Sequence, residues 1–150
     1  MPLVLLVNPD DHMRDLYGNW LVSLGFDLVC AADALVAAGI ARTCQPDVII
    51  TELQLRRSDG LVLIRCLKAS AVTRDLPIVV VTKLTQPEIV QAAMAAGAIA
   101  VMPSLTDFDG VRTILAAALT RGPVNSSRRR KSFSIAAVLR AAHASDWDES

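Results

Sequence analysis

The segment Pro46-Asp47-Val48-Ile49-Ile50-Thr51-Glu52 decides the fold class, because it contains a continuous apolar run that ends on a threonine and a carboxylate. Such a run is too short for a core helix, and its lack of alternation is typical of a strand buried on both faces of a parallel sheet. Similar runs recur along the chain. They predict strands over Leu3–Val7, Val48–Thr51, Ile78–Thr82 and Ala98–Met102, with a weaker strand over Phe26–Cys30.

Segments with helical spacing lie between the predicted strands. The first carries an apolar stripe of Met13, Leu16, Trp20, Leu21 and Leu24 and ends before Gly25, and the last repeats the i, i+3, i+4, i+7 spacing over Val111–Leu119. The other predicted helices span Asp33–Arg42, Gly60–Ala69 and Pro87–Ala96. Strict alternation of strands and helices predicts an α/β domain with a parallel sheet and helices on both faces. In such sheets the chemistry lies at the carboxyl ends of the strands.

The composition excludes several classes of protein. The 150 residues carry 15 basic and 15 acidic side chains and are 53% hydrophobic, which excludes a disordered chain and a uniformly basic nucleic-acid binder. We find no apolar run of the ~18–20 residues that span a bilayer and expect no signal peptide. Cys30, Cys44 and Cys66 are an odd set without metal-like spacing, so we expect reduced, buried thiols in a cytoplasmic protein.

The composition changes near residue 121, so we divide the chain into a domain over residues 1–121 and a basic extension over residues 122–150. Residues 1–120 hold 9 basic and 12 acidic side chains, and residues 121–150 hold 6 basic and 3 acidic ones. The extension shows no recognisable output domain. A linker-like stretch is followed by the basic block Arg128, Arg129, Arg130 and Lys131, and Phe133–Ala144 has the spacing of a short amphipathic helix.

Residues 2–120 resemble the receiver domain of two-component response regulators in the order and spacing of several motifs. These are Leu5-Leu6-Val7, Met13-Arg14, Leu24-Gly25-Phe26, Pro46-Asp47-Val48-Ile49-Ile50, Ser58-Asp59-Gly60-Leu61, Leu76-Pro77-Ile78-Val79-Val80-Val81-Thr82 and Ala96-Gly97-Ala98. The resemblance implies a flavodoxin-like (βα)5 fold, a doubly wound parallel sheet of five strands. It also implies transfer of a phosphoryl group from a histidine kinase to an aspartate after the third strand. In that family an acidic pair holds Mg²⁺, and a hydroxyl and a lysine complete the site.

The chain departs from the family at the positions of this site. Asn8 and Pro9 stand where the acidic pair belongs, and we expect Asp10, which follows them, to cap the first helix. Glu52 stands at the phosphoacceptor position and carries its charge about 1.5 Å further from the backbone than an aspartate would. A shift of about 1 Å can lower a rate by two orders of magnitude. Glu52 is either a built-in mimic of the phosphorylated state, bonded to the retained Thr82, or a tolerated substitution.

The lysine of the family site is also missing, since Ser104 or, with a one-residue deletion, Met102 takes its position. Lys83 follows Thr82, but alternation along a strand turns its side chain away, so we expect Lys83 to be solvated. Val101 replaces the aromatic switch residue, and Leu55-Arg56 replaces a Met-Pro pair. We therefore expect no cofactor, weak or absent Mg²⁺ binding and no enzymatic activity.

These residues predict a degenerate receiver that acts in signal transduction through protein–protein contacts independent of phosphorylation. In the family, the face of the fourth helix, fifth strand and fifth helix carries such contacts. We expect a homodimer, or a partner such as a histidine kinase, on the corresponding residues Met94, Val101, Met102 and Leu105. Two alternatives stay open: the block over Arg128–Lys131 binds nucleic acid or an anionic surface, or the cleft keeps residual phosphoacceptor activity in a phosphorelay.

Overall fold

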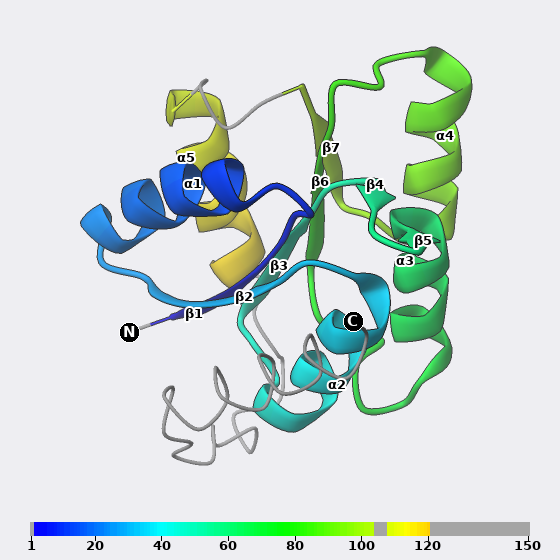
Figure 1. The fold of residues 1–150 in the computed structure, drawn as a ribbon, viewed down its shortest axis with the longest axis horizontal. Helices are drawn as coiled ribbons and strands as arrows, with labels where there is room; N and C mark the ends of the chain where they lie inside the picture. Colours follow the sequence, from blue (N-terminus) through cyan, green and yellow to red (C-terminus); the bar gives the residue numbers. More distant parts are fainter. Residues whose placement is uncertain (1, 104–107, 121–150) are drawn as a thin grey trace.

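Five parallel strands form the central sheet of the computed structural model, which describes residues 2–103 and 108–120 (Figure 1). The strands are β1 Leu3–Val7, β2 Asp27–Ala31, β3 Val48–Thr51, β6 Ile78–Val81 and β7 Ala100–Met102, in the order β2-β1-β3-β6-β7. The predicted fold class is confirmed. The predicted bounds coincide with those of β1 and β3 and differ by one or two residues at the other strands. The strand order reverses between β1 and β3, so their carboxyl ends flank the crevice typical of such sheets.

Helices cover both faces of the sheet (Figure 1). On one face lie α1 Asp11–Ser23 and α5 Phe108–Thr120, and on the other lie α2 Ala34–Cys44, α3 Gly60–Ala69 and α4 Pro87–Ala96. Side chains alternate between the faces along each strand. Leu5 accordingly packs with the cluster under α2 and α3, whereas Leu6 packs with the cluster under α1 and α5.

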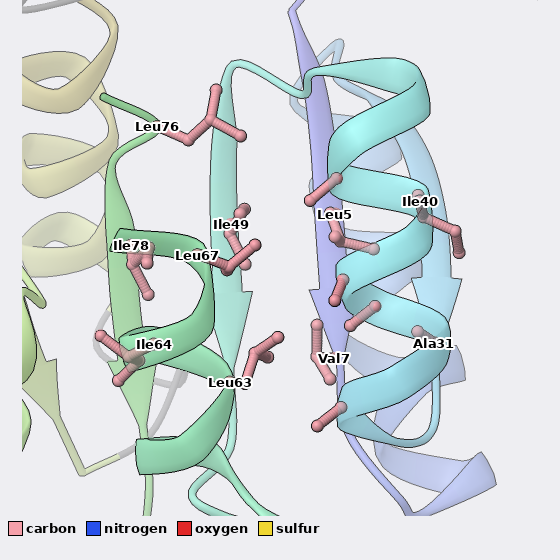
Figure 2. Packing of buried hydrophobic residues seen from close by; sticks show 14 of the residues in the cluster. Leu5, Val7, Ala31, Ile40, Ile49, Leu63, Ile64, Leu67, Leu76 and Ile78 are labelled. Carbon is pink, nitrogen blue, oxygen red and sulfur yellow. The ribbon is translucent and has the colours of Figure 1, made fainter. Parts of the chain in front are cut away.

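The larger of the two cores lies between the sheet and the helices α2 and α3 (Figure 2). Ile49 from the centre of the sheet and Leu63, Ile64 and Leu67 from α3 are at most 2% exposed. Burial of an aliphatic side chain of this size contributes about 1.5–3 kcal/mol to stability. This packing holds the end of β3, and therefore Glu52, in a rigid frame.

The buried face of α1 differs from the predicted stripe. Leu16 is 58% exposed, and Tyr17 and Gly18 are buried instead. The cause is the close approach of β2: a Cβ at Gly18 would lie 2.7 Å from Leu28 Cδ2. The glycine side of the helix therefore faces the sheet, and Leu16 is turned outward.

A two-stranded hairpin between β3 and α3 was not predicted. It pairs β4 Gln54–Leu55 with β5 Ser58–Asp59, and Arg57 in its turn has a positive φ of 62°. Strands of two residues are too short to show the alternation that identifies a strand in a sequence. The hairpin places Arg56 beside the loop that follows β1.

The helix α4 is held by few buried side chains. Its N-cap Gln86 makes no side-chain capping bond, and Ala93 is its only buried residue. The helix ends at Gly97, whose φ is 128°. Lys68 of α3 lies against this turn, and its Nζ donates to the carbonyl oxygens of Arg74 at 2.8 Å and Leu76 at 2.9 Å.

The prediction of buried thiols holds for one cysteine and is wrong for another. All three cysteines are free; Cys44 is buried, Cys30 is half-buried and Cys66 is exposed. Cys66 follows exposed Arg65 on α3, on the side of the helix that faces away from the sheet. Burial raises the pKa of the Cys30 thiol to about 11, so that thiol is protonated at neutral pH.

Candidate functional site

A cleft of about 240 Å³ lies at the carboxyl ends of β1, β3 and β6. The structure brings together here most of the residues predicted for the site: Asn8, Pro9, Asp10, Glu52, Thr82 and Lys83. Pro103, which the sequence places just after a strand, also lines the cleft, whereas sequence reasoning missed Met13, Tyr17, Gln54 and Val81. Helical spacing from Asp10 places Met13 and Tyr17 on the same side of α1, and this signal could have identified both. Ser104 lies outside the described residues.

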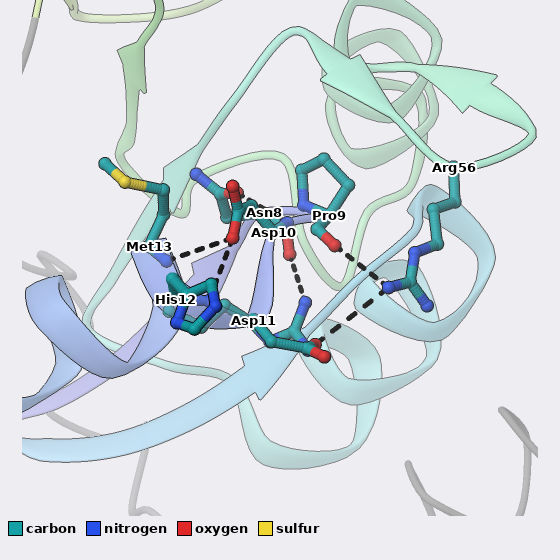
Figure 3. A network of polar contacts seen from close by, with 8 residues as sticks. Asn8, Pro9, Asp10, Asp11, His12, Met13 and Arg56 are labelled. Carbon is teal, nitrogen blue, oxygen red and sulfur yellow. Dashed lines mark hydrogen bonds and ion pairs between the residues drawn. The ribbon is translucent and has the colours of Figure 1, made fainter.

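Asp10 is the N-cap of α1, as expected (Figure 3). Its Oδ1 accepts hydrogen bonds from the backbone N–H groups of His12 at 2.9 Å and Met13 at 3.4 Å. The Oδ1 of Asn8 in turn accepts from the backbone N–H of Asp10 at 2.9 Å. The side chains of Asn8 and Asp10 therefore stabilise the N-terminus of α1. The cap contributes about 1 kcal/mol to stability.

Two guanidinium groups bind the backbone of the same loop, and Figure 3 shows the contact made by Arg56. Arg14 Nη1 donates to the carbonyl oxygen of Asn8 at 2.6 Å, and Arg56 Nη2 donates to that of Pro9 at 3.1 Å. Asp11 forms an ion pair with Arg14 and lies 3.9 Å from Arg56. The sequence indicates the Asp11–Arg14 pair through its i, i+3 spacing. The contact of Arg56 depends on the hairpin and has no local sequence signal.

Glu52 follows β3, and its backbone N–H extends the ladder by donating to the carbonyl oxygen of Val7 at 2.9 Å. Its Oε2 is buried and has no hydrogen-bond partner in the described part of the chain. Burial raises the pKa of the Glu52 carboxyl, while the Thr82 hydroxyl, the Leu53 amide and the charge of Lys83 act in the opposite direction. The carboxylate is therefore partly desolvated and only partly compensated.

Thr82 and Lys83 follow β6 on the far side of the cleft. Thr82 is 2% exposed, its backbone N–H donates to the carbonyl oxygen of Met102 at 2.9 Å, and its Oγ1 accepts from the N–H of Leu84 at 3.2 Å. Lys83 is exposed, as expected, and within residues 2–103 and 108–120 it forms no ion pair with Glu52.

The response regulator receiver domain family matches residues 4–114. The chain belongs to this family. It is therefore a receiver domain of two-component signal transduction, a class of signalling domains that interact with histidine kinases and other proteins.

Individual relatives agree with this assignment. A DNA-binding dual master transcriptional regulator from Synechocystis is 31% identical over 86 residues, which cover 57% of this chain and 36% of that protein. Regulatory protein VirG of Agrobacterium fabrum is 30% identical over 141 residues, 89% of this chain and 52% of that protein. The receiver thus spans about a third to a half of these two relatives.

A solved structure shows the same fold. The receiver domain of a sensor histidine kinase from Pseudomonas aeruginosa superposes with a TM-score of 0.74 at 22% identity, covering 79% of this chain and 98% of that domain. In that protein a magnesium ion is coordinated in the active-site cleft.

The residues predicted for a partner face differ in accessibility in this receiver. Met94 on α4 is 45% exposed, and Val101 is half-buried. Met102 is 7% exposed and packs in the core under α1 and α5, so its side chain does not contribute to a surface. Leu105 and the basic block Arg128–Lys131 lie outside the described residues. In the part of the chain that is described, no helix is long and apolar enough to cross a membrane.

Proposed function

We propose that this receiver acts through protein contacts that do not depend on phosphorylation, with Glu52 in place of the phosphoacceptor aspartate. The pair of guanidinium groups on the loop after β1 carries this proposal. Arg14 and Arg56 bind the carbonyl oxygens of Asn8 and Pro9, the two positions at which the family places acidic side chains. Positive charge thus stands beside the place where a metal-binding site needs negative charge.

The donor set of the cleft does not fit Mg²⁺, which requires near-octahedral oxygen ligands. The side-chain oxygen of Asn8 accepts a bond from the backbone of Asp10, Pro9 has no side-chain oxygen, and Asp10 caps α1. In the described residues no group of three or more His, Cys, Asp or Glu side chains is placed to hold a metal ion. We therefore derive no phosphoryl-transfer step for this cleft.

Both interpretations of Glu52 lead to the same function. The Thr82 hydroxyl, which favours the carboxylate form, supports a built-in mimic of the phosphorylated state. The unpartnered Oε2 supports a tolerated substitution, because a phosphoryl mimic gains its effect from new hydrogen bonds. In either case the state of the cleft is set by the sequence and does not change with kinase activity.

Under this proposal the surface that binds a partner is accessible at all times, because it does not depend on phosphorylation. We place the partner or second copy on the face around α4, where Met94 is exposed and adaptable. The location we propose is the cytoplasm, where histidine kinases interact with their signalling partners.

Mass spectrometry of the intact chain after incubation with Mg²⁺ and acetyl phosphate tests the proposal. We expect no phosphoryl adduct on the wild-type chain, and none on Glu52→Asp, because the variant restores only the nucleophile. A receiver with the full acidic site, treated in parallel, serves as the positive control. Stoichiometric, Mg²⁺-dependent modification of the wild type would overturn the proposal and establish residual phosphoacceptor activity.

A further inference from the structure

An apolar groove lies on the opposite side of the molecule from the cleft. It has a volume of about 210 Å³ and is formed between the turn that links α1 to β2 and the outer side of α5. Phe26 directly precedes β2, which places the groove at the amino-terminal edge of the sheet. The lining residues are Leu24, Phe26, Arg112, Leu115, Ala116 and Leu119.

The α5 side of the groove is a continuous stripe. Arg112, Leu115, Ala116 and Leu119 follow the i, i+3, i+4, i+7 spacing of one helix face. Leu115 is 2% exposed and forms the floor, whereas Ala116 is exposed and its small side chain leaves the groove open. The helices α1 and α5 lie next to each other on this face of the sheet (Figure 1). The groove therefore has the form that accepts the apolar face of a further helix.

A segment of this chain has the matching pattern. In Phe133–Ala144, 9 of 12 residues are apolar, and Ile135, Val138, Leu139 and Ala142 repeat the i, i+3, i+4, i+7 spacing. The linker of residues 121–132 begins directly after α5, which ends at Thr120 beside Leu119 of the groove. Fully extended, this linker reaches roughly 40 Å, so it does not restrict access to the groove.

Charge favours the same arrangement. Residues 1–120 carry a net charge of −3 and residues 121–150 a net charge of +3. Asp27, Asp47 and Asp75 lie at the amino-terminal edge of the sheet, where α5 ends, together with Arg42, Lys68 and Arg74. The tail and the domain thus carry opposite net charges, and the short tether that begins after α5 keeps the local concentration of the tail at the groove in the millimolar range.

We propose that residues 133–144 pack as an amphipathic helix into the groove of the same chain, with Ile135, Val138 and Leu139 against the α5 stripe. The tail then covers the groove between the α1–β2 turn and α5. This inference does not depend on the state of Glu52, because the groove and the cleft lie at opposite edges of the sheet.

Methyl NMR on the full chain tests the contact directly. We expect nuclear Overhauser contacts from the Ile135 and Leu139 methyl groups to Leu115 and Leu119 that do not vary with protein concentration. Amide exchange over residues 133–144 should be at least about tenfold slower than in an unstructured chain. Ala116→Arg, which fills the groove, and Leu139→Asp should both abolish these signals.

Ser134→Asp is the matched control, since it adds the same charge as Leu139→Asp outside the apolar stripe, and it should leave the contacts in place. Leu139 lies well beyond α5 in the sequence, so Leu139→Asp gives a result even if Ala116→Arg unfolds. Contacts that are absent, that persist in Leu139→Asp, or that appear only at high concentration would overturn the proposal. Protection of residues 133–144 that requires duplex DNA or phosphatidylglycerol vesicles would also overturn it and assign the tail to an anionic partner.

Discussion

At the scale of single residues, Glu52 is the least satisfied group of the cleft. It sits at the end of a strand whose residues are fully buried, and its Oε2 has no donor in the described part of the chain. A buried acceptor without a partner costs about 1–3 kcal/mol relative to the same group in water. The rest of the fold must compensate for this cost at neutral pH.

Replacing the carboxyl by an amide should therefore stabilise the protein. Burial raises the folded-state pKa of Glu52 above its unfolded value, so the folded chain holds this proton more tightly than the unfolded chain does. The tighter binding of this proton stabilises the folded chain. Its contribution is present below the unfolded pKa and is lost as the pH rises through the folded pKa. We expect Glu52→Gln to raise the free energy of unfolding by about 1 kcal/mol at pH 7.5, with the gain disappearing at acidic pH.

Urea unfolding of both proteins across this pH range measures the effect. Glu88→Gln, which removes a carboxylate at an exposed position of α4, is the control and should not stabilise the chain. A gain for Glu52→Gln that is the same at every pH would show that the carboxylate charge is not its cause.

At the scale of secondary structure, two glycines in different helical segments predict opposite results. Gly97 ends α4 with a φ of 128°, and a Cβ there would lie 2.7 Å from Lys68 Cγ. Gly39 lies inside α2, and a Cβ there would have nothing within 4 Å. We expect Gly97→Ala to destabilise the protein by about 1–2 kcal/mol and Gly39→Ala to stabilise it by about 0.5–1 kcal/mol. Urea titration with an unchanged m value measures both, and a reversed order would contradict the described turn.

The elements differ in how far their sequence determines them. The strand β1 is entirely apolar and β3 is apolar up to its last residue, Thr51, because both faces of these strands are buried, so their bounds were predictable. The buried side of α1 was not, since the approach of Leu28 to Gly18 is a tertiary contact. At the site, Asp10 was predictable as a cap because capping is a local interaction. The contact of Arg56 with the loop after β1 was not predictable, because it joins segments that are distant in the sequence.

At the scale of the whole molecule, the partner face that we propose around α4 is tested through its exposed apolar residue. Met94 on α4 is 45% exposed and Leu35 on α2 is 73% exposed. If the α4 face carries the dimer, Met94→Glu should weaken self-association at least about tenfold while changing the stability by less than about 0.5 kcal/mol. Sedimentation velocity over a concentration series measures this.

Leu35→Glu makes the same change of charge on a different helix and should leave association unaltered. A wild-type chain that remains monomeric at every concentration would remove the dimer from the proposal. Equal weakening by both variants would place the contact elsewhere or show that added charge alone prevents association.

The two arginines on the loop after β1 also bear on evolutionary reversibility. Arg14 comes from α1 and Arg56 from the hairpin, so the loop is held from two places that are distant in the sequence. Replacement of Glu52 by aspartate leaves both guanidinium groups on the carbonyl oxygens of Asn8 and Pro9. Under the proposed function, building a metal-binding cleft here therefore requires coordinated changes in the loop, in α1 and in the hairpin.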